Sequence, residues 1–413
     1  MDYSEMIKTY RHKELISQQE LAEMLGVSFA SVNRWENGRH EPSYQVKREL
    51  KKIFERAGII DSIDEEEAIM SVKECKINNR RYLGNKYKLL TFIYEVIDQN
   101  CRDITSVADI FSGTGAFSSL FWDKEVITND LLYSNYISNV AWFSPQFVDK
   151  RKLKLIIFEY NQIECTEENY MTENFTNTYF SFEDCSKIGY IREDIEQRFL
   201  NKEINERERA VLITSLLYSM DKIANTCGHY DAYIKGAIFS RHLELLYPDV
   251  PNNNRTNNQC YNEDANELAR KINADLVYID PPYNSRQYCD AYHLLENVAR
   301  WQKPAVSGVA RKMDRHLLKS KYCTNSATEA MEDLIMNISA RYIVLSYNNM
   351  GQKGNGRSNA KIDDADIIRI LSKKGIVKIY SKEHKAFSTG KSEIEDNEER
   401  LFICICGKGD AND

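Results

Sequence analysis

The stretch that decides the fold is residues 276–288, which read LVYIDPPYNSRQY. Its first four residues are apolar, as in a buried strand that ends at Asp280. Two prolines follow at once, so neither the strand nor a helix continues there. We expect a rigid extended turn that fixes the Asp280 carboxylate, the Pro281 carbonyl and the Tyr283 ring. These groups suit a flat ring that carries an amino group, because two acceptors meet the amine and an aromatic face stacks on the ring.

A second strand and turn lies earlier, at residues 106–117, which read SVADIFSGTGAF. A buried strand, a glycine turn and a helix open a doubly wound sheet, and the glycines let the backbone lie against a ligand. The dinucleotide pattern is incomplete because position 118 is serine, which favours a sulfonium cofactor over NAD. The next expected strand ends at Asp130, which is placed to accept ribose hydroxyls.

A third motif precedes both, at residues 80–90, which read RRYLGNKYKLL and lead into an apolar-periodic helix. Gly84 permits a close backbone approach at the helix entrance, and Lys86 supplies a fixed cation there.

Together these motifs resemble the N6-adenine-specific DNA methyltransferases. Asp-Pro-Pro-Tyr is similar to motif IV of that family, Phe-Ser-Gly-Thr-Gly to motif I and residues 80–90 to motif X, and residues 280–288 resemble the FokI-type modification methylases. The order of the motifs is that of the D12 class with alpha order. The resemblance implies S-adenosylmethionine as cofactor and Asp280, Pro281 and Tyr283 as catalytic residues. It implies the following cofactor-binding residues: Tyr82, Lys86, Asp109, Phe111, Gly113, Gly115, Asp130 and Asp280. Asp109 either contacts the methionine amino group or caps the turn.

The N-terminal residues predict a helix-turn-helix. Ser17 and Glu20 form a capping-box pattern, Gly26 ends the first helix, and residues 29–36 form the second. The pattern resembles the repressor-type Cro/C1 and XRE-like proteins. In that family the second helix enters the major groove, which aims four side chains at DNA: Ser28, Ser31, Asn33 and Arg34. The alternative is a helical bundle that serves only packing or dimerisation.

Residues 140–270 carry few strand signals and predict a mostly helical insertion, with a long helix over residues 206–224. The helix leads into the loop NTCGHYDAYIK, residues 225–235, whose aromatic and polar side chains suit contacts with phosphates and bases. In the family this is the place of the target-recognition region, and the expected DNA contacts are His229, Tyr230 and Lys235.

The expected organisation is a helix-turn-helix domain at residues 1–56, an acidic linker at 57–76 and a methyltransferase domain at 77–413. The predicted fold class is α/β, a Rossmann-like methyltransferase sheet with a helical recognition insertion and a small all-α domain. Near the C-terminus we expect a buried strand at 342–349, a loop over DNA at 350–359 and a closing hairpin from 376–380 and 401–406.

Composition bears on the compartment in which the protein works and on the ligands that it binds. The chain has 413 residues with no apolar run of eighteen, so no membrane helix is expected, and its polar, charged N-terminus argues against a signal peptide. Ten cysteines without a CxxC pair favour reduced thiols in a cytoplasmic protein and no metal site. The net charge is −7, so any positive field that attracts DNA is local.

The expected function is transfer of a methyl group to N6 of an adenine flipped out of duplex DNA, as the modification component of a restriction-modification system. A cognate restriction endonuclease acting on the same site is then an expected partner. The N-terminal domain suggests that the protein also represses its own operon. The sequence leaves the oligomeric state open. Alternatives are N4-cytosine methylation, methylation of RNA or a protein amide, and a DNA-binding regulator with a degenerate methylase half. The absence of a Pro-Cys sequence argues against cytosine C5 chemistry.

Overall fold

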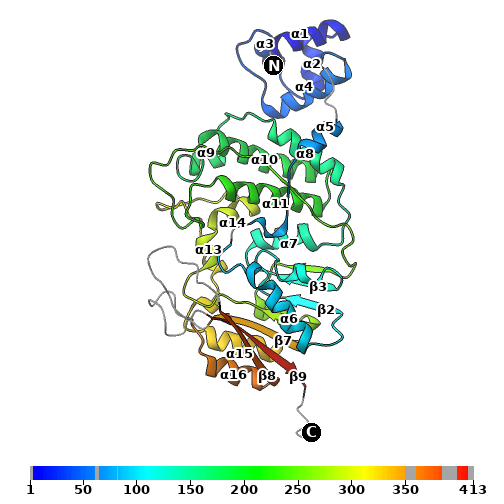
Figure 1. The fold of residues 1–413 in the computed structure, drawn as a ribbon. Helices are drawn as coiled ribbons and strands as arrows, with labels where there is room; N and C mark the ends of the chain where they lie inside the picture. Colours follow the sequence, from blue (N-terminus) through cyan, green and yellow to red (C-terminus); the bar gives the residue numbers. More distant parts are fainter. Residues whose placement is uncertain (1–2, 61–64, 81, 349–359, 384–397, 408–413) are drawn as a thin grey trace. The chain divides into compact units, whose positions relative to one another are not determined.

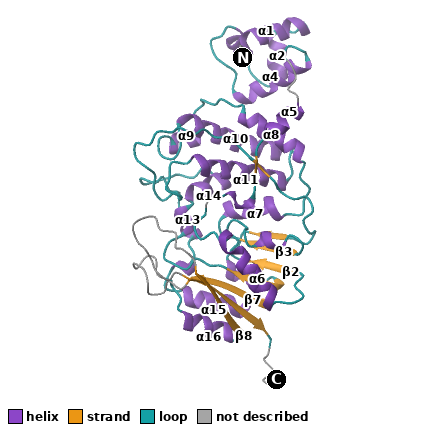
Figure 2. Cartoon of the chain, in the orientation of Figure 1, coloured by secondary structure: helices purple, strands orange, loops and turns teal. Residues whose placement is uncertain are grey.

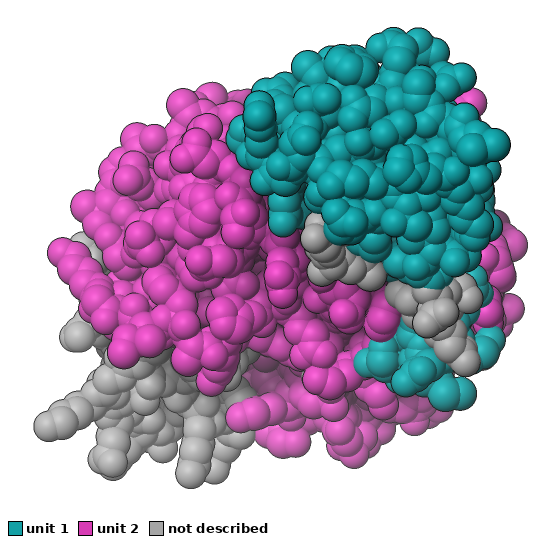
Figure 3. All heavy atoms as spheres, turned by 90° about the horizontal axis from the view of Figure 1, so that it is seen from above, with its two compact units in different colours: residues 1–71 teal, residues 72–413 magenta. Residues whose placement is uncertain are grey.

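The computed structural model describes residues 3–60, 65–80, 82–348, 360–383 and 398–407. The chain divides into two compact units, residues 1–71 and 72–413, which are coloured separately in Figure 3. This boundary lies inside residues 57–76, the segment expected as an acidic linker. Part of that segment, residues 65–71, is not a linker but forms a helix with Ala68 buried. The expected loop at 350–359 lies outside the described residues. No helix among the described residues is both long enough and apolar enough to cross a lipid bilayer.

The first unit is all-helical. Its helices are α1 (Tyr3–Glu14), α2 (Gln18–Leu25), α3 (Phe29–Glu36), α4 (Tyr44–Arg56) and α5 (Glu65–Ser71). The predicted capping box at the start of α2 is confirmed, since Ser17 Oγ accepts from Glu20 N and the Glu20 carboxylate accepts from Ser17 N. Gly26 ends α2 at φ +65°, a left-handed conformation that favours glycine. The apolar faces of α1 to α4 meet around Leu21, Val32 and Phe54, which are fully buried.

The second unit is built on a seven-stranded sheet with strand order β5-β3-β2-β6-β7-β9-β8. All of its neighbouring strands pair in parallel except β9, which is antiparallel to β7 and β8. The strands of this sheet are β2 (Ser106–Asp109), β3 (Glu125–Asn129), β5 (Gln259–Tyr261), β6 (Asn273–Ile279), β7 (Ser339–Asn348), β8 (Gly375–Glu383) and β9 (Glu398–Cys406). A separate parallel pair is formed by β1 (Glu74–Cys75) and β4 (Tyr247–Pro248).

Helices cover both faces of the sheet. The helices of this unit are α6 (Leu90–Asn100), α7 (Tyr133–Phe143), α8 (Lys150–Asn161), α9 (Tyr170–Phe175), α10 (Phe182–Leu200), α11 (Glu206–Ile223), α12 (Ala265–Ala269), α13 (Tyr288–Ala291), α14 (His293–Arg300), α15 (Ala327–Asn337) and α16 (Asp364–Ser372). One sheet face packs on α12, α15 and α16 in a continuous apolar core. Helix α6 contacts the other face, since Tyr380 of β8 donates a hydrogen bond to Asn100. Figures 1 and 2 show α8 to α11 gathered to one side of the strands.

Two predicted elements differ from the structure. The glycine turn after β2 leads into a short 3-10 helix, Ser118–Phe121, because the connection to β3 leaves too little chain for a longer helix. The helical insertion also ends earlier than residue 270, since β5 pairs with β3 as an edge strand of the main sheet. A three-residue strand offers no alternating pattern to read from sequence. The predicted long helix over 206–224 and the closing hairpin are both confirmed, as α11 and as β8 with β9.

Candidate active site

One cavity of the second unit opens at the carboxyl ends of β2, β3 and β6. Asp109 is the last residue of β2, Asp130 directly follows β3 and Asp280 directly follows β6. These three strands are parallel neighbours, so their carboxyl ends meet at one edge of the sheet. All three acids line the cavity, which encloses about 1140 Å³ including open space at its mouth. The chain runs from β2 outward to β3 on one side and to β6 on the other, which is where open α/β sheets bind ligands.

The predicted catalytic carboxylate lies in a network of buried charges. Lys86 Nζ is 3.1 Å from Asp280 Oδ1 and 2.9 Å from Glu399 Oε1, and Ser346 Oγ donates to the same Glu399 oxygen at 2.8 Å. Burial acts to lower the pKa of Lys86, but the two carboxylates outweigh it and hold that pKa well above its usual value. Burial raises the pKa of Asp280 to about 6, and Lys86 opposes that rise. Lys86 is therefore charged, and Asp280 is ionised at neutral pH.

The turn after β6 presents further groups beside Asp280. Pro281, Pro282 and Tyr283 all line the cavity. The Tyr283 carbonyl accepts from Lys361 N at 2.8 Å, and the Tyr283 ring meets Tyr347 edge-on with centroids 6.4 Å apart. Burial raises the pKa of the Tyr283 hydroxyl, so the ring is neutral. The turn is thus held from two sides while its ring still faces the cavity.

An aromatic stack joins the motif at residues 80–90 to the segment that follows the turn at residues 280–283. The Tyr82 ring stacks on Tyr292 with centroids 4.5 Å apart and on Tyr288 at 5.5 Å. The Tyr292 hydroxyl accepts from Leu83 N at 2.7 Å, and the Tyr288 hydroxyl donates to Leu83 O at 3.2 Å. Gly84 has φ +73°, and a Cβ there would lie 2.8 Å from the Tyr288 hydroxyl. Glycine is therefore required at position 84 on both conformational and steric grounds.

The glycine turn after β2 is tied to the end of β3. Gly113 N donates to Asp130 Oδ2 at 2.9 Å, and Leu132 N donates to Asp130 Oδ1 at 2.8 Å. Burial raises the pKa of Asp130 to about 6, although these bonds counteract it. A Cβ on Gly113 would approach the Tyr82 ring at 3.4 Å, so the ring lies against the turn. The turn, the acid and the aromatic ring form one wall of the cavity.

Asp109 has an unusual environment for a carboxyl group. It is 1% exposed, and its Oδ2 accepts from Ser118 Oγ at 2.9 Å. Its Oδ1 is buried without a hydrogen-bond partner among the described residues. Burial raises the pKa of Asp109 to about 8, and the charges of Asp280 and Asp130 also raise it. Asp109 is therefore largely protonated at neutral pH and has capacity to bond a ligand in the cavity that it lines.

All of the predicted catalytic and cofactor-binding residues except Gly115 line the cavity. Phe111 lines the cavity with the residues above, and its ring meets Tyr322 edge-on at 5.1 Å. Gly115 does not line it. A Cβ on Gly115 would lie 2.5 Å from Asn139 Oδ1 and 2.8 Å from the Phe143 ring, so this glycine is needed for packing against α7. We no longer count Gly115 among the candidate cofactor contacts.

The expected DNA-contacting loop after α11 is well anchored. Tyr230 is 2% exposed and its hydroxyl donates to Asp221 at 2.8 Å, so its ring belongs to the interior. We withdraw Tyr230 as a direct DNA contact, because alternation of aromatic and polar residues does not reveal which rings turn inward. Lys235 is exposed and His229 is half-buried, so both stay candidates.

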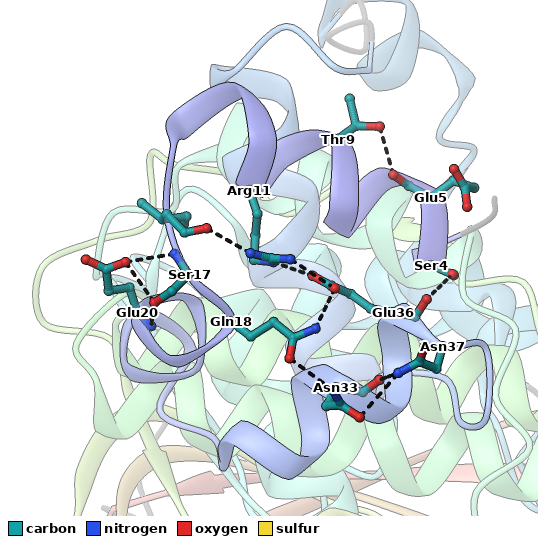
Figure 4. Close-up of polar contacts among 11 residues, drawn as sticks. Ser4, Glu5, Thr9, Arg11, Ser17, Gln18, Glu20, Asn33, Glu36 and Asn37 are labelled. Atoms are coloured by element: carbon teal, nitrogen blue, oxygen red, sulfur yellow. Dashed lines mark hydrogen bonds and ion pairs between the residues drawn. The ribbon is translucent and has the colours of Figure 1, made fainter.

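In the first unit, the four candidate DNA contacts differ in exposure and in the hydrogen bonds that they make within the protein. Ser28 and Arg34 are exposed, while Ser31 is half-buried and its N–H donates to Ser28 Oγ at the start of α3. Asn33 Nδ2 donates to Gln18 at 3.1 Å, and Asn33 Oδ1 accepts from Asn37 at 3.2 Å. Figure 4 shows this amide inside a polar network that includes Gln18 and Glu36. Asn33 is thus partly committed to holding α2 and α3 together.

Sequence reasoning missed several residues that shape the cavity. Glu399 follows a run of acidic residues typical of a solvated segment, and only the pairing of β9 with β7 brings it to Lys86. Asp264 and Asn266 reach the cavity from α12, which follows the unforeseen strand β5. The apolar run at 401–406, which predicts one strand of the closing hairpin, is a signal in the sequence that begins close to Glu399.

The chain belongs to the D12 class of N6 adenine-specific DNA methyltransferases, which residues 82–355 match as a family. The mixed α/β sheet and its cavity agree with the fold of S-adenosylmethionine-dependent methyltransferases. Residues 7–50 match the helix-turn-helix family, in agreement with α2 and α3.

Among its relatives, the chain is similar to the modification methylase StsI of Streptococcus sanguinis, at 34% identity over 78% of this chain and 51% of that protein. It is similar to the type II methyltransferase M.FokI of Planomicrobium okeanokoites, at 33% identity over 78% of this chain and 52% of that protein. The chain thus spans about half the length of these two relatives. It is also similar to the type II methyltransferase M.NlaIII of Neisseria lactamica, at 30% identity over 76% of this chain and 93% of that protein.

Proposed function

We propose that this chain transfers a methyl group from S-adenosylmethionine to N6 of an adenine flipped out of duplex DNA, as the modification methylase of a restriction-modification system. The observation that carries the proposal is the shared cavity, in which the glycine turn at Gly113 and the acceptor turn at Asp280 are walls of one space. Membership of the D12 class supports adenine N6 as the target. The names of the relatives support a modification role.

The residues present fit the proposed cofactor. Asp109 offers a carboxyl oxygen with no hydrogen-bond partner among the described residues, and Asp130 offers acceptor capacity for ribose hydroxyls. Gly113 has φ +52°, a left-handed conformation that favours glycine at this point of the cavity wall. Lys86 and its two carboxylates carry one net negative charge, which complements a sulfonium cation. When bound, S-adenosylmethionine supplies a methyl group on a positively charged sulfur.

The catalytic turn acts on the adenine amine. The N6 lone pair is delocalised into the ring, and hydrogen bonds from the amine to Asp280 and to the Pro281 carbonyl draw it back toward the nitrogen. Asp280 serves as a pre-set acceptor that fixes the direction of the amine, and the rate gain comes from orientation and electrostatics. Stacking on Tyr283 offsets part of the cost of unstacking the base, which is a few kcal/mol.

The test is direct. Purified chain is incubated with S-adenosylmethionine and plasmid DNA, and the digested nucleosides are separated by mass spectrometry. The proposal predicts N6-methyladenine. N4-methylcytosine would favour the rival amine target, which the same acceptor turn could orient, and cofactor binding without any DNA methylation would favour a regulator with an inactive methylase half.

A further inference from the structure

A strongly basic stretch follows the catalytic turn rather than preceding it. Residues 311–321 read RKMDRHLLKSK, with five basic side chains and the single carboxylate Asp314. The stretch lies outside residues 140–270, where the sequence placed DNA recognition. In a chain of net charge −7 such a stretch is a local positive field.

The basic side chains of this stretch fall into two groups. Lys312 pairs with Asp231 at 2.6 Å and Arg315 pairs with Asp290 at 2.7 Å, so these two hold the stretch in place. The side chains of Arg311, Lys319 and Lys321 are exposed, and within the described part of the chain no carboxylate lies within 4.0 Å of their charged nitrogens, although the charge of Lys321 acts on Asp333 from farther away. Three cations are therefore available to an external anion.

Another basic run in the same protein shows that a basic sequence does not by itself leave cations without ion-pair partners. Residues 150–154 read KRKLK, an equally basic run. Lys150 pairs with Glu74 and Asp249 at 3.1 Å, and Lys154 pairs with Glu74 at 2.8 Å. Carboxylates pair with Lys150 and Lys154 of that run, whereas Lys319 and Lys321 have no ion pair within the described residues.

Two of these cations, Lys319 and Lys321, flank Ser320, which is held beside the turn that follows β6. The Gln287 side chain bonds the Ser320 backbone in both directions, accepting from Ser320 N at 2.8 Å and donating to Ser320 O at 3.1 Å. Cys323 Sγ donates to Arg286 O at 3.3 Å. Arg286, itself exposed, is thereby held near the stretch. Ser320 and Lys321 line the same cavity as Pro282 and Tyr283, so these residues form part of its wall.

The stretch is also joined to the candidate DNA-contacting loop after α11. Besides the ion pair between Lys312 and Asp231, the Tyr179 hydroxyl lies 2.7 Å from Tyr230 O and 2.9 Å from Ala310 O. The loop and the stretch therefore form one anchored surface.

We propose that Arg286, Lys319 and Lys321 form a phosphate-binding rim that takes the backbone of the DNA strand carrying the target base. The inference rests on the proposed function. A nucleotide whose base enters the cavity brings its own phosphates to the mouth, where fixed cations neutralise them. Because the rim contacts no base edge, it contributes affinity and positioning but not sequence choice.

The test uses the full chain carrying Lys319→Ala and Lys321→Ala together. The DNA is a duplex with a site that the wild-type chain methylates, and its dissociation constant is measured over a range of salt concentrations with S-adenosylhomocysteine present. Each phosphate contact contributes about 0.9 to the slope of log affinity against log salt. We expect the slope to fall by roughly 1 to 2 relative to wild type.

The matched control carries Lys150→Ala and Lys154→Ala together, which removes two lysines that are paired with carboxylates. The slope of log affinity against log salt for this control should stay close to that of wild type. Unfolding temperatures check that both variants fold, and Arg286→Ala provides a second probe of the rim. An unchanged slope in the rim variant would overturn the inference. A loss of S-adenosylhomocysteine affinity with an unchanged slope would overturn it too, by assigning Lys321 to the cofactor. Both outcomes leave the proposed function intact, which fails instead if the wild-type chain forms no N6-methyladenine in DNA.

Discussion

The ionisation of Asp280 depends on two neighbours that act in opposite directions. Burial is the largest influence and raises the pKa of Asp280 to about 6, Lys86 lowers it and Glu399 raises it. Protonation removes the negative charge of Asp280 and turns one of its acceptor oxygens into a donor, so the proposed transfer depends on the carboxylate form. The proposed activity should therefore be lost as the pH falls through about 6.

Two single changes should move this acid limb in opposite directions. Lys86→Gln removes the cation that favours the carboxylate, so the limb should shift to higher pH. Glu399→Gln removes the competing negative charge, so the limb should shift to lower pH. Single-turnover methyl transfer measured from pH 5 to 9 tests both changes. Cofactor must be saturating, because burial also raises the pKa of Asp130 to about 6. Identical acid limbs in the three proteins would contradict the account.

The helix-turn-helix depends on one buried carboxylate that ties three helices together. Arg11 of α1 pairs with Glu36 of α3, and Gln18 of α2 donates to Glu36 at 2.6 Å (Figure 4). Burial acts to raise the pKa of Glu36, but the bonds from Arg11 and Gln18 outweigh it and hold the pKa below its usual value. A lowered pKa means that the ionised form stabilises the fold. That stabilisation is present above the unfolded pKa and is lost as the pH falls through the folded one.

Glu36→Gln should lower the free energy of unfolding of the helix-turn-helix by about 2 kcal/mol at pH 7, less than for a fully buried pair because Arg11 keeps some exposure. The difference from wild type should begin to shrink below about pH 4.5, where the unfolded chain binds a proton at Glu36, and should disappear as the pH falls through the lower folded pKa. Denaturant unfolding followed at several pH values measures it. Glu23→Gln, on the exposed side of α2, is the control and should change stability little. A pH-independent difference would argue against the charge as its source.

Elements encoded locally were predictable, and elements that depend on distant pairing were not. Three elements are determined by fewer than about a dozen neighbouring residues each. They are the strand before Asp280, the glycine turn after Asp109 and the capping box at Ser17. The edge strand β5 exists only because β3 pairs with it. Likewise Glu399 reaches Lys86 only through the insertion of β9 between β7 and β8. The two turns that line the cavity were therefore predictable from the sequence, while Glu399, which pairs with Lys86 beside Asp280, was not.

At the scale of the whole molecule, the two units carry separate DNA-directed elements. Arg34 is exposed on α3 of the first unit, whereas the acceptor turn belongs to the second. Arg34→Ala should weaken DNA binding and leave the methyl-transfer rate at saturating DNA unchanged, because no catalytic group is touched. Binding and single-turnover assays on the same preparation separate the two effects. Lys52→Ala on α4 is the control for loss of one exposed charge. A lower rate at saturating DNA would show that the two units act together in catalysis.

The central claim is that one cavity brings a cofactor wall and an amine-accepting turn together. The most direct measurement compares Asp280→Asn with wild type in cofactor binding by calorimetry and in single-turnover methyl transfer to DNA. Asparagine keeps the size of the side chain and one acceptor oxygen, but it removes the negative charge that orients and polarises the amine. We predict cofactor affinity within a few-fold of wild type and a transfer rate lowered by roughly 10² to 10³. Full transfer activity in this variant would contradict the account.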